Sequence, residues 1–173
     1  DDEDDDAELL LQEIEAMSVR EIRTQLAARQ IRWAGLLEKR DLVQALYQAR
    51  LAAKSFSVHL TPGQVGDLTG EQVQDELENN TADGISPLLL DVYATWCGPC
   101  QLVAPQVQAV AETLGQDLRV AKMDSDAHPQ MAGKLRVQGL PTLILFNGQG
   151  QEVDRMEGAL MKDQMLQWIE SKV

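Results

Sequence analysis

The sequence predicts an α/β domain over residues 65–173, with a central mixed sheet covered by helices on both faces. Apolar runs of the buried-strand type alternate there with segments of helical pattern, and this order is typical of such a sheet. The preceding residues 9–54 instead carry their apolar side chains only at helical spacing. The fold class is therefore α/β, with a small all-α helix-extended-loop-helix module in front of it.

The elements of the α/β domain follow from the spacing of apolar residues and from one turn signal. The pair Asn147-Gly148 is typical of a hairpin, so the segment after it is expected to pair back on the strand before it. Strands are predicted over residues 88–93, 118–123, 142–146 and 152–156, and helices over 71–79, 102–114, 129–135 and 162–173.

Residues 1–8 form an acidic head with seven acidic residues and no basic one. Like charges repel and nothing in this stretch can be buried, so we expect it to be disordered. The alternative is a partner-binding or autoinhibitory segment that folds over residues 9–54, whose net charge is +3.

Residues 9–54 are predicted to form a helical module with a thin core. Ser18 followed by Glu21 makes a capping box, which places the start of a helix there. Gly35 marks the loop before a last helix. The expected buried residues of that last helix are Leu42, Val43, Leu46 and Tyr47.

Residues 55–64 are interpreted as a linker because they end in the turn-forming sequence Thr61-Pro62-Gly63. The alternation of Phe56, Val58 and Leu60 with polar residues leaves a docked edge strand as the alternative.

Composition narrows the class of protein. The net charge is −13, and residues 55–173 alone carry −9, which disfavours non-specific nucleic-acid binding. No apolar run reaches the roughly 18–20 residues that cross a bilayer, so no membrane partner is expected. The chain shows no signal-peptide pattern and begins with Asp1, which we interpret as a processed form.

Both cysteines of the chain lie in one Cys-x-x-Cys motif, Cys97 to Cys100. A disulfide framework would need more cysteines, and a zinc site would need four ligands. His59 and His128 do not have metal-ligand spacing, so no metal site is expected.

The motif falls between a predicted buried strand and a helix, and this placement has chemical consequences. A cysteine at a helix N-terminus is stabilised as the thiolate by backbone N–H groups and by the helix dipole. Gly98 and Pro99 shape the turn that brings the second thiol within disulfide reach. Cys97 is therefore the expected nucleophile, and the more buried Cys100 is expected to resolve the mixed disulfide.

Three further positions support a dithiol site. Asp91 interrupts an apolar strand, so it is either a buried proton acceptor for Cys100 or a strand-end residue exposed to water. Lys122 lies in a neighbouring strand and either pairs with Asp91 or is an ordinary surface lysine. Pro141 precedes an apolar strand, which is compatible with a cis bond that exposes backbone groups for a substrate strand.

Together these residues resemble the thioredoxin family over essentially all of residues 65–173. The segments 93–101 and 154–160 are most similar to y-type chloroplast thioredoxins, although Tyr93 replaces a common tryptophan and Gln101 a lysine. The resemblance implies the thioredoxin fold, no bound cofactor, Asp91 as buried acid/base with Lys122 as its partner, and Pro141 in cis. It also implies a substrate groove made of Trp96, Gly98, Pro99, Leu140, Pro141, Thr142 and Gly158.

Residues 17–26 and 38–46 resemble the two helices of SAP domains. Such modules are often nucleic-acid binders, although Gln30 stands where they commonly have glycine. The resemblance implies a nucleic-acid or protein partner for residues 9–54.

Two functional hypotheses follow. The first is a protein disulfide reductase that acts on disulfide-containing target proteins and is recharged by a thioredoxin reductase. The second is a redox regulator tethered to nucleic acid or to a protein assembly through residues 9–54. The y-type likeness implies the chloroplast stroma, with the cytoplasm as the alternative.

Overall fold

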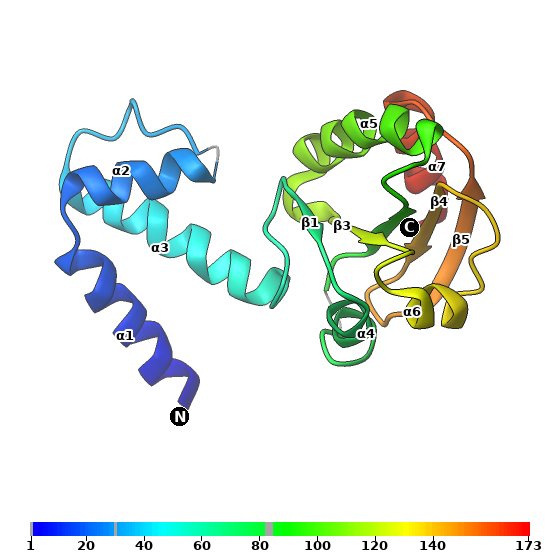
Figure 1. The fold of residues 1–173 in the computed structure, drawn as a ribbon. Helices are drawn as coiled ribbons and strands as arrows, with labels where there is room; N and C mark the ends of the chain where they lie inside the picture. The colour runs from blue at the N-terminus through cyan, green and yellow to red at the C-terminus, as the bar shows by residue number, and fades with distance from the viewer. Residues whose placement is uncertain (1, 30, 82–84) are drawn as a thin grey trace. The chain divides into compact units, whose positions relative to one another are not determined.

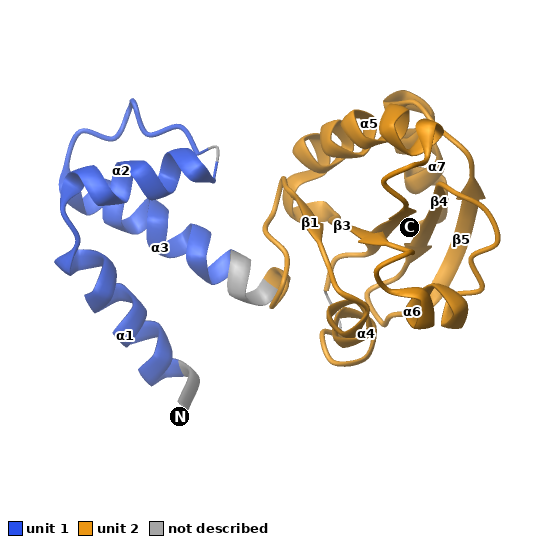
Figure 2. Ribbon diagram, viewed as in Figure 1, with its two compact units in different colours: residues 1–55 blue, residues 56–173 orange. Residues whose placement is uncertain are grey.

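The structure is a computed structural model, and it describes residues 2–29, 31–81 and 85–173, without the side chains of residues 2, 3 and 53–55. It divides into two compact units, residues 1–55 and 56–173 (Figure 2). Each unit has its own core of buried apolar side chains.

The first unit is helical, as predicted. It contains α1 (Asp2–Ala16), α2 (Val19–Ala28) and most of α3 (Lys39–Phe56) (Figure 1). The Ser18 hydroxyl accepts a hydrogen bond from the Glu21 amide at 3.2 Å, and the Glu21 carboxylate accepts one from the Ser18 amide at 2.7 Å. The predicted capping box is thus confirmed. The core of the unit consists of Ile14, Ile22, Leu26, Leu42, Val43 and Leu46, with Tyr47 half-buried against it.

The acidic head differs from the expectation of disorder, because α1 begins at Asp2 and runs without a break into the apolar residues of the module. Ile14 is fully buried, and Glu13 forms an ion pair with Arg50 of α3 at 2.9 Å. These contacts anchor the helix, and acidic residues in a first turn interact favourably with the helix dipole. Charge repulsion alone was therefore a poor guide to this segment.

The second unit is built on a mixed sheet, as predicted, and this sheet has five strands. Its strand order is β1-β3-β2-β4-β5, with β1, β3 and β2 parallel and with β4 antiparallel to both β2 and β5. The strands are β1 (Val65–Asp67), β2 (Leu88–Tyr93), β3 (Arg119–Asp124), β4 (Thr142–Phe146) and β5 (Glu152–Glu157). Strand β1 was not predicted, because three residues are too few to show a periodic pattern.

Helices cover both faces of this sheet (Figure 1). On one face, side chains of α4 and α6 pack against Leu88, Leu90 and Val92 of β2. On the other face, α5 and α7 pack against Leu89 of β2 and Leu143 of β4. The helices are α4 (Gly70–Glu78), α5 (Gly98–Leu114), the 3-10 turn Gly115–Asp117, α6 (Pro129–Lys134) and α7 (Lys162–Lys172).

The hairpin between β4 and β5 forms as predicted, but a different glycine makes its turn. Gly150, not Gly148, adopts the left-handed backbone conformation, with φ of 77°. A side chain at Gly150 would also approach the carbonyl oxygen of Leu77 to 1.9 Å. The Asn147 side chain closes the loop by accepting hydrogen bonds from the amides of Gln149 and Gln151, both at 3.0 Å.

The segment expected to be a linker packs onto the second unit instead. Phe56 and Leu60 belong to the core, whereas Val58 is 74% exposed, and no strand forms there. Ser57 is buried because its hydroxyl donates to the carboxylate of Glu76 in α4. The segment is therefore held by a polar anchor as well as by apolar contacts.

Glu76 is the centre of a buried charge cluster that the sequence did not reveal. Its carboxylate pairs with the Arg119 guanidinium at 2.8 Å, and both side chains are 0% exposed. The Asn80 side chain donates to the same carboxylate at 2.8 Å, and the amide of His59 donates at 3.2 Å. The cluster joins α4, β3 and the segment after α3 through a buried pair of charges. One terminal nitrogen of Arg119 has no hydrogen-bond partner among the described residues.

We expect Glu76→Gln to lower the free energy of unfolding by about 3 kcal/mol, because the guanidinium of Arg119 would remain buried without a counter-charge. Urea unfolding measures this, with Glu78→Gln on the exposed side of the same helix as the matched control. That control should change stability by less than about 0.5 kcal/mol. Equal losses in both variants would contradict the assigned role of the pair.

Candidate active site

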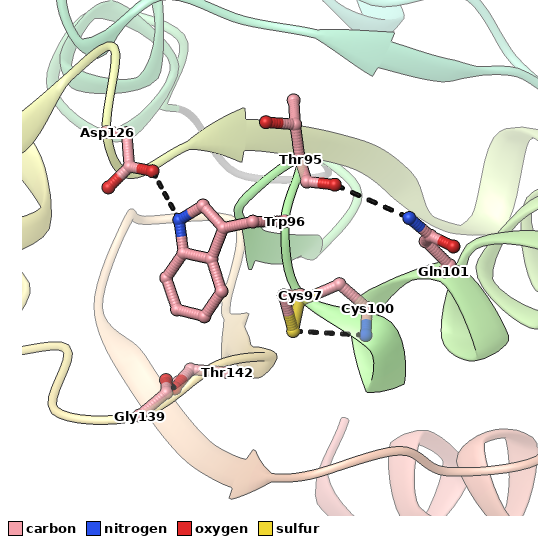
Figure 3. Close-up of a disulfide and its surroundings, with 8 residues drawn as sticks. All are labelled: Thr95, Trp96, Cys97, Cys100, Gln101, Asp126, Gly139 and Thr142. Carbon is pink, nitrogen blue, oxygen red and sulfur yellow. Dashed lines mark hydrogen bonds between the residues drawn. A yellow bond between two sulfur atoms is a disulfide. The ribbon is translucent and has the colours of Figure 1, made fainter.

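The two cysteines meet where β2 leads into α5. Cys97 is the N-cap residue of α5, and Pro99 occupies the first turn of the helix. The Cα atoms of Cys97 and Cys100 are 5.3 Å apart, and their sulfur atoms form a disulfide (Figure 3). The Cys100 amide donates a hydrogen bond to the sulfur of Cys97 at 3.2 Å. In the reduced chain the same amide and the helix dipole would stabilise a Cys97 thiolate.

The burial of the pair differs from the prediction. Cys97 and Cys100 are each 4% exposed, so in the disulfide form Cys100 is not the more buried residue. Both pack with Ala94, and Leu140 from the loop before β4 lies against the same small cluster.

Asp91 is buried in β2, only 2% exposed, so the alternative of a solvated strand end is wrong. Among the described residues, one carboxylate oxygen of Asp91 has no hydrogen-bond partner. Burial raises the pKa of Asp91 to about 7, and the positive charge of Lys122 opposes this rise. Near neutral pH this carboxyl group can therefore take up or release a proton.

Lys122 is the lateral neighbour of Asp91 in the β2–β3 pairing, as expected. It is half-buried, and its ammonium nitrogen lies 5.4 Å from the centre of the Tyr93 ring. Leu143 flanks Asp91 on the other side, from β4. Since Leu143 packs with α5 and α7, Asp91 and Lys122 lie on the sheet face that α5 covers.

The expected substrate groove surrounds the disulfide unevenly. The Leu140-Pro141 peptide bond is cis, as predicted. Thr142 is fully buried and donates its hydroxyl to the Gly139 carbonyl oxygen at 2.6 Å, so its side chain is not available to a partner. Gly158 donates its amide to the Pro141 carbonyl oxygen at 2.9 Å. Exposed residues on this rim are Trp96, Gly98 and Pro99, while Leu140 and Gly158 are half-buried and Pro141 is buried.

Two acidic residues near the site were missed by the sequence analysis. The indole N–H of Trp96, itself 71% exposed, donates to Asp126 at 2.6 Å (Figure 3). The Tyr93 hydroxyl donates to Asp67 at 3.2 Å. A signal existed for Asp126, because it follows the predicted strand over residues 118–123 and parallel strands end at one edge of a sheet. Asp67 had no such signal, since β1 was not predicted.

No group of three or more His, Cys, Asp and Glu side chains that could hold a metal ion occurs in the described part of the chain. Likewise, no helix within residues 2–29, 31–81 and 85–173 is both long and apolar enough to cross a membrane.

Comparison with known proteins supports the same site. The profile of the family described as Thioredoxin matches residues 65–171. Thioredoxin Y1, chloroplastic, of Arabidopsis thaliana is 42% identical over 103 residues, which cover 60% of this chain and 59% of that protein. A thioredoxin-like protein of Synechocystis is 48% identical over 84 residues, covering 49% of this chain and 79% of the relative.

Solved structures agree with these sequence relatives. Chloroplastic thioredoxin z superposes with a TM-score of 0.56 at 33% identity, over 62% of this chain and 93% of the other. The thioredoxin of Fasciola hepatica superposes with a TM-score of 0.53 at 30% identity, over 61% of this chain and 95% of the other. The family profile begins at residue 65, and the chain spans about three fifths of the Arabidopsis relative.

The raised pKa of Asp91 predicts a pH-dependent stability. Below the ordinary aspartate pKa of 3.8 the carboxyl group is protonated in both folded and unfolded chains, and the contribution of Asp91 to the free energy of unfolding is fully present. Between that value and about 7 the unfolded chain ionises first, so the contribution is lost progressively, up to about 4 kcal/mol. We expect Asp91→Asn to remove this fall, measured by denaturant unfolding of the disulfide form from pH 4 to 8. Parallel curves for the two proteins would contradict the assignment.

Proposed function

Because this chain belongs to the thioredoxin family, we propose that it is a protein disulfide reductase whose redox pair is Cys97 and Cys100. The observation that carries the proposal is the disulfide at the first turn of α5. The buried carboxyl group of Asp91 lies in β2, six residues before Cys97 along the chain. Thiol–disulfide exchange needs a stabilised thiolate, a second thiol within reach and a proton acceptor, and this arrangement offers all three.

The proposed reaction transfers two electrons from the dithiol to the target. The Cys97 thiolate attacks one sulfur of a target disulfide, so that the target bond breaks and its other sulfur leaves as a thiolate. Cys100 then loses its proton and attacks the Cys97 sulfur. The mixed disulfide breaks, the second target sulfur leaves, and the bond between Cys97 and Cys100 forms. The two released target sulfurs take up protons, and the target is reduced.

Asp91 is proposed as the group that takes the proton of Cys100, with Lys122 as its partner. A carboxyl group with an ordinary pKa would be a poor acceptor for a thiol proton, because the two pKa values would lie far apart. Burial raises the pKa of Asp91 to about 7 and brings it closer to that of a thiol. The lateral pairing with Lys122 keeps part of the ionised form accessible.

The rim around the disulfide is proposed to receive the extended target segment. Trp96 offers an exposed ring beside the sulfur atoms, and its bond to Asp126 fixes the orientation of that ring. Thr142 would act only through backbone groups, since its side chain is buried. The proposed groove residues are Trp96, Gly98, Pro99, Leu140, Pro141, Thr142 and Gly158.

A thioredoxin reductase is proposed as the electron donor, and disulfide-containing proteins as the targets. In support, the bifunctional thioredoxin reductase/thioredoxin of Mycobacterium leprae is 38% identical over 111 residues, which cover 64% of this chain. The chloroplast stroma is the proposed location, on the strength of the chloroplastic relatives, and the cytoplasm is the alternative.

A second candidate function is that of a redox regulator tethered through residues 9–54 to nucleic acid or to a protein assembly. A hollow of about 510 Å³ on the module is lined in part by Arg20, Arg23 and Trp33. The Arg23 guanidinium covers the Trp33 ring, 4.7 Å from its centre. A phosphate group could contact the arginines, but stacking on Trp33 would first require Arg23 to move.

The reductase proposal is tested by dithiothreitol-dependent reduction of insulin by the full chain. We expect steady turnover that falls at least about 100-fold in Cys97→Ser, because the nucleophile is gone. Cys100→Ser should instead accumulate a mixed disulfide with the target, which denaturing gels without reductant detect. Equal turnover by the native chain and Cys97→Ser would refute the proposed nucleophile.

The tether is tested by gel shift of labelled duplex DNA with the full chain between 50 and 200 mM salt. Binding through phosphate contacts should weaken steeply over this range and should be lost in Arg20→Gln/Arg23→Gln. Absence of a shift at 50 mM salt would rule out a DNA tether and leave a protein assembly as the partner class.

A further inference from the structure

Three charged residues form one lateral row across the parallel strands. Asp67 of β1 and Asp91 of β2 are both direct neighbours of Lys122 in β3, one on each side. Their burial is graded, since Asp67 is exposed, Lys122 is half-buried and Asp91 is buried. Lys122 therefore stands between two carboxylates, one in water and one inside the protein.

Tyr93 contacts two members of this row, Asp67 and Lys122. It lies two residues after Asp91 in β2, on the same face of the sheet. Its hydroxyl donates to the two carboxylate oxygens of Asp67 at 3.3 and 3.2 Å. Its ring faces the ammonium group of Lys122, 5.4 Å from nitrogen to ring centre. One side chain thus contacts both the exposed carboxylate and the lysine.

Tyr93 stays protonated under working conditions, because burial and then the charge of Asp67 raise its pKa to about 12. The other charged group that bears on the row is Asp124, which lies two residues after Lys122 in β3. From β4 the facing residue is the apolar Leu143. Among the described residues, Lys122 is the cation that acts on Asp91.

We propose that the hydrogen bond between Tyr93 and Asp67 positions Lys122 and thereby sets how firmly Asp91 holds its proton. The Tyr93 hydroxyl occupies the oxygens of Asp67 and weakens their attraction for the lysine. The ring gives the ammonium group a favourable surface on the side of Asp91. Tyr93 and Asp67 are positioning residues here, since neither touches the reacting sulfur atoms. An effect of this proton on the rate of disulfide reduction rests on the proposed reductase function. The electrostatic arrangement itself does not rest on that function.

The arrangement predicts opposite effects for two conservative changes. Tyr93→Phe keeps the ring but frees the oxygens of Asp67, so Lys122 is drawn outward and the pKa of Asp91 rises. Asp67→Asn removes the competing charge, so Lys122 acts more fully on Asp91 and the pKa of Asp91 falls. Each shift should be roughly 0.5 to 1 pH unit. The double variant should match Asp67→Asn, because the hydroxyl acts only through the charge of Asp67.

The experiment is a carbon-13 NMR titration of the aspartate carboxyl groups in the full chain in its disulfide form. Asp91→Asn identifies the signal of Asp91, and Asp117→Asn serves as the matched control. Asp117 is an exposed aspartate just before β3, so its loss removes the same charge at the other end of the strand and should leave the titration unchanged.

Opposite shifts in the two single variants, with the double variant following Asp67→Asn, would support the proposal. Shifts in the same direction, additive shifts or no shift would overturn it. The titration needs no turnover, so it tests the positioning of Lys122 separately from the reductase function. A chain that shows the opposite shifts but cannot reduce insulin would refute the reductase function alone, and an active chain without them would refute only the positioning role.

Discussion

The buried carboxyl group of Asp91 is the constraint around which the second unit is organised. A carboxylate inside a sheet is unfavourable unless it is paired or protonated, and one of its oxygens has no partner among the described residues. In the parallel pairing of β2 with β3, Lys122 lies beside Asp91. The chain then leads from β2 into the dithiol at the start of α5. The same arrangement brings the acidic strand ends Asp67 and Asp124 to this edge. Protonation relieves this cost, in keeping with the raised pKa of Asp91.

A second buried acid shows how differently the same unit treats a carboxylate with a structural role. Glu76 lies on the opposite side of the sheet and is fully matched by Arg119, Ser57, Asn80 and the amide of His59. With its charge paired and its oxygens occupied, this group joins three segments of the unit. Burial by itself thus does not identify a functional carboxyl group. Asp91 differs from Glu76 in that one of its carboxylate oxygens has no hydrogen-bond partner among the described residues.

The helical unit has its own core of buried apolar side chains and is connected to the second unit by continuous chain. Its helices bury six apolar residues, and α1 brings a dense set of carboxylates to a module whose α2 and following loop carry arginines. Exposed acidic and basic residues in one small unit can attract a charged partner or attract each other, and salt changes both effects.

The sequence by itself determined the dithiol, the α/β class, most strand and helix positions and the capping box at Ser18, because each depends on residues close together along the chain. It also singled out Asp91, Lys122 and Pro141, since a charge within an apolar strand or a proline before one is unusual in any context. It missed the pairs Glu76–Arg119, Trp96–Asp126 and Tyr93–Asp67, and it predicted disorder for residues 1–8 and a linker over residues 55–64. Only the tertiary structure decided these, because each depends on groups that lie far apart in sequence, and their partners are chosen by strand order and packing rather than by local pattern.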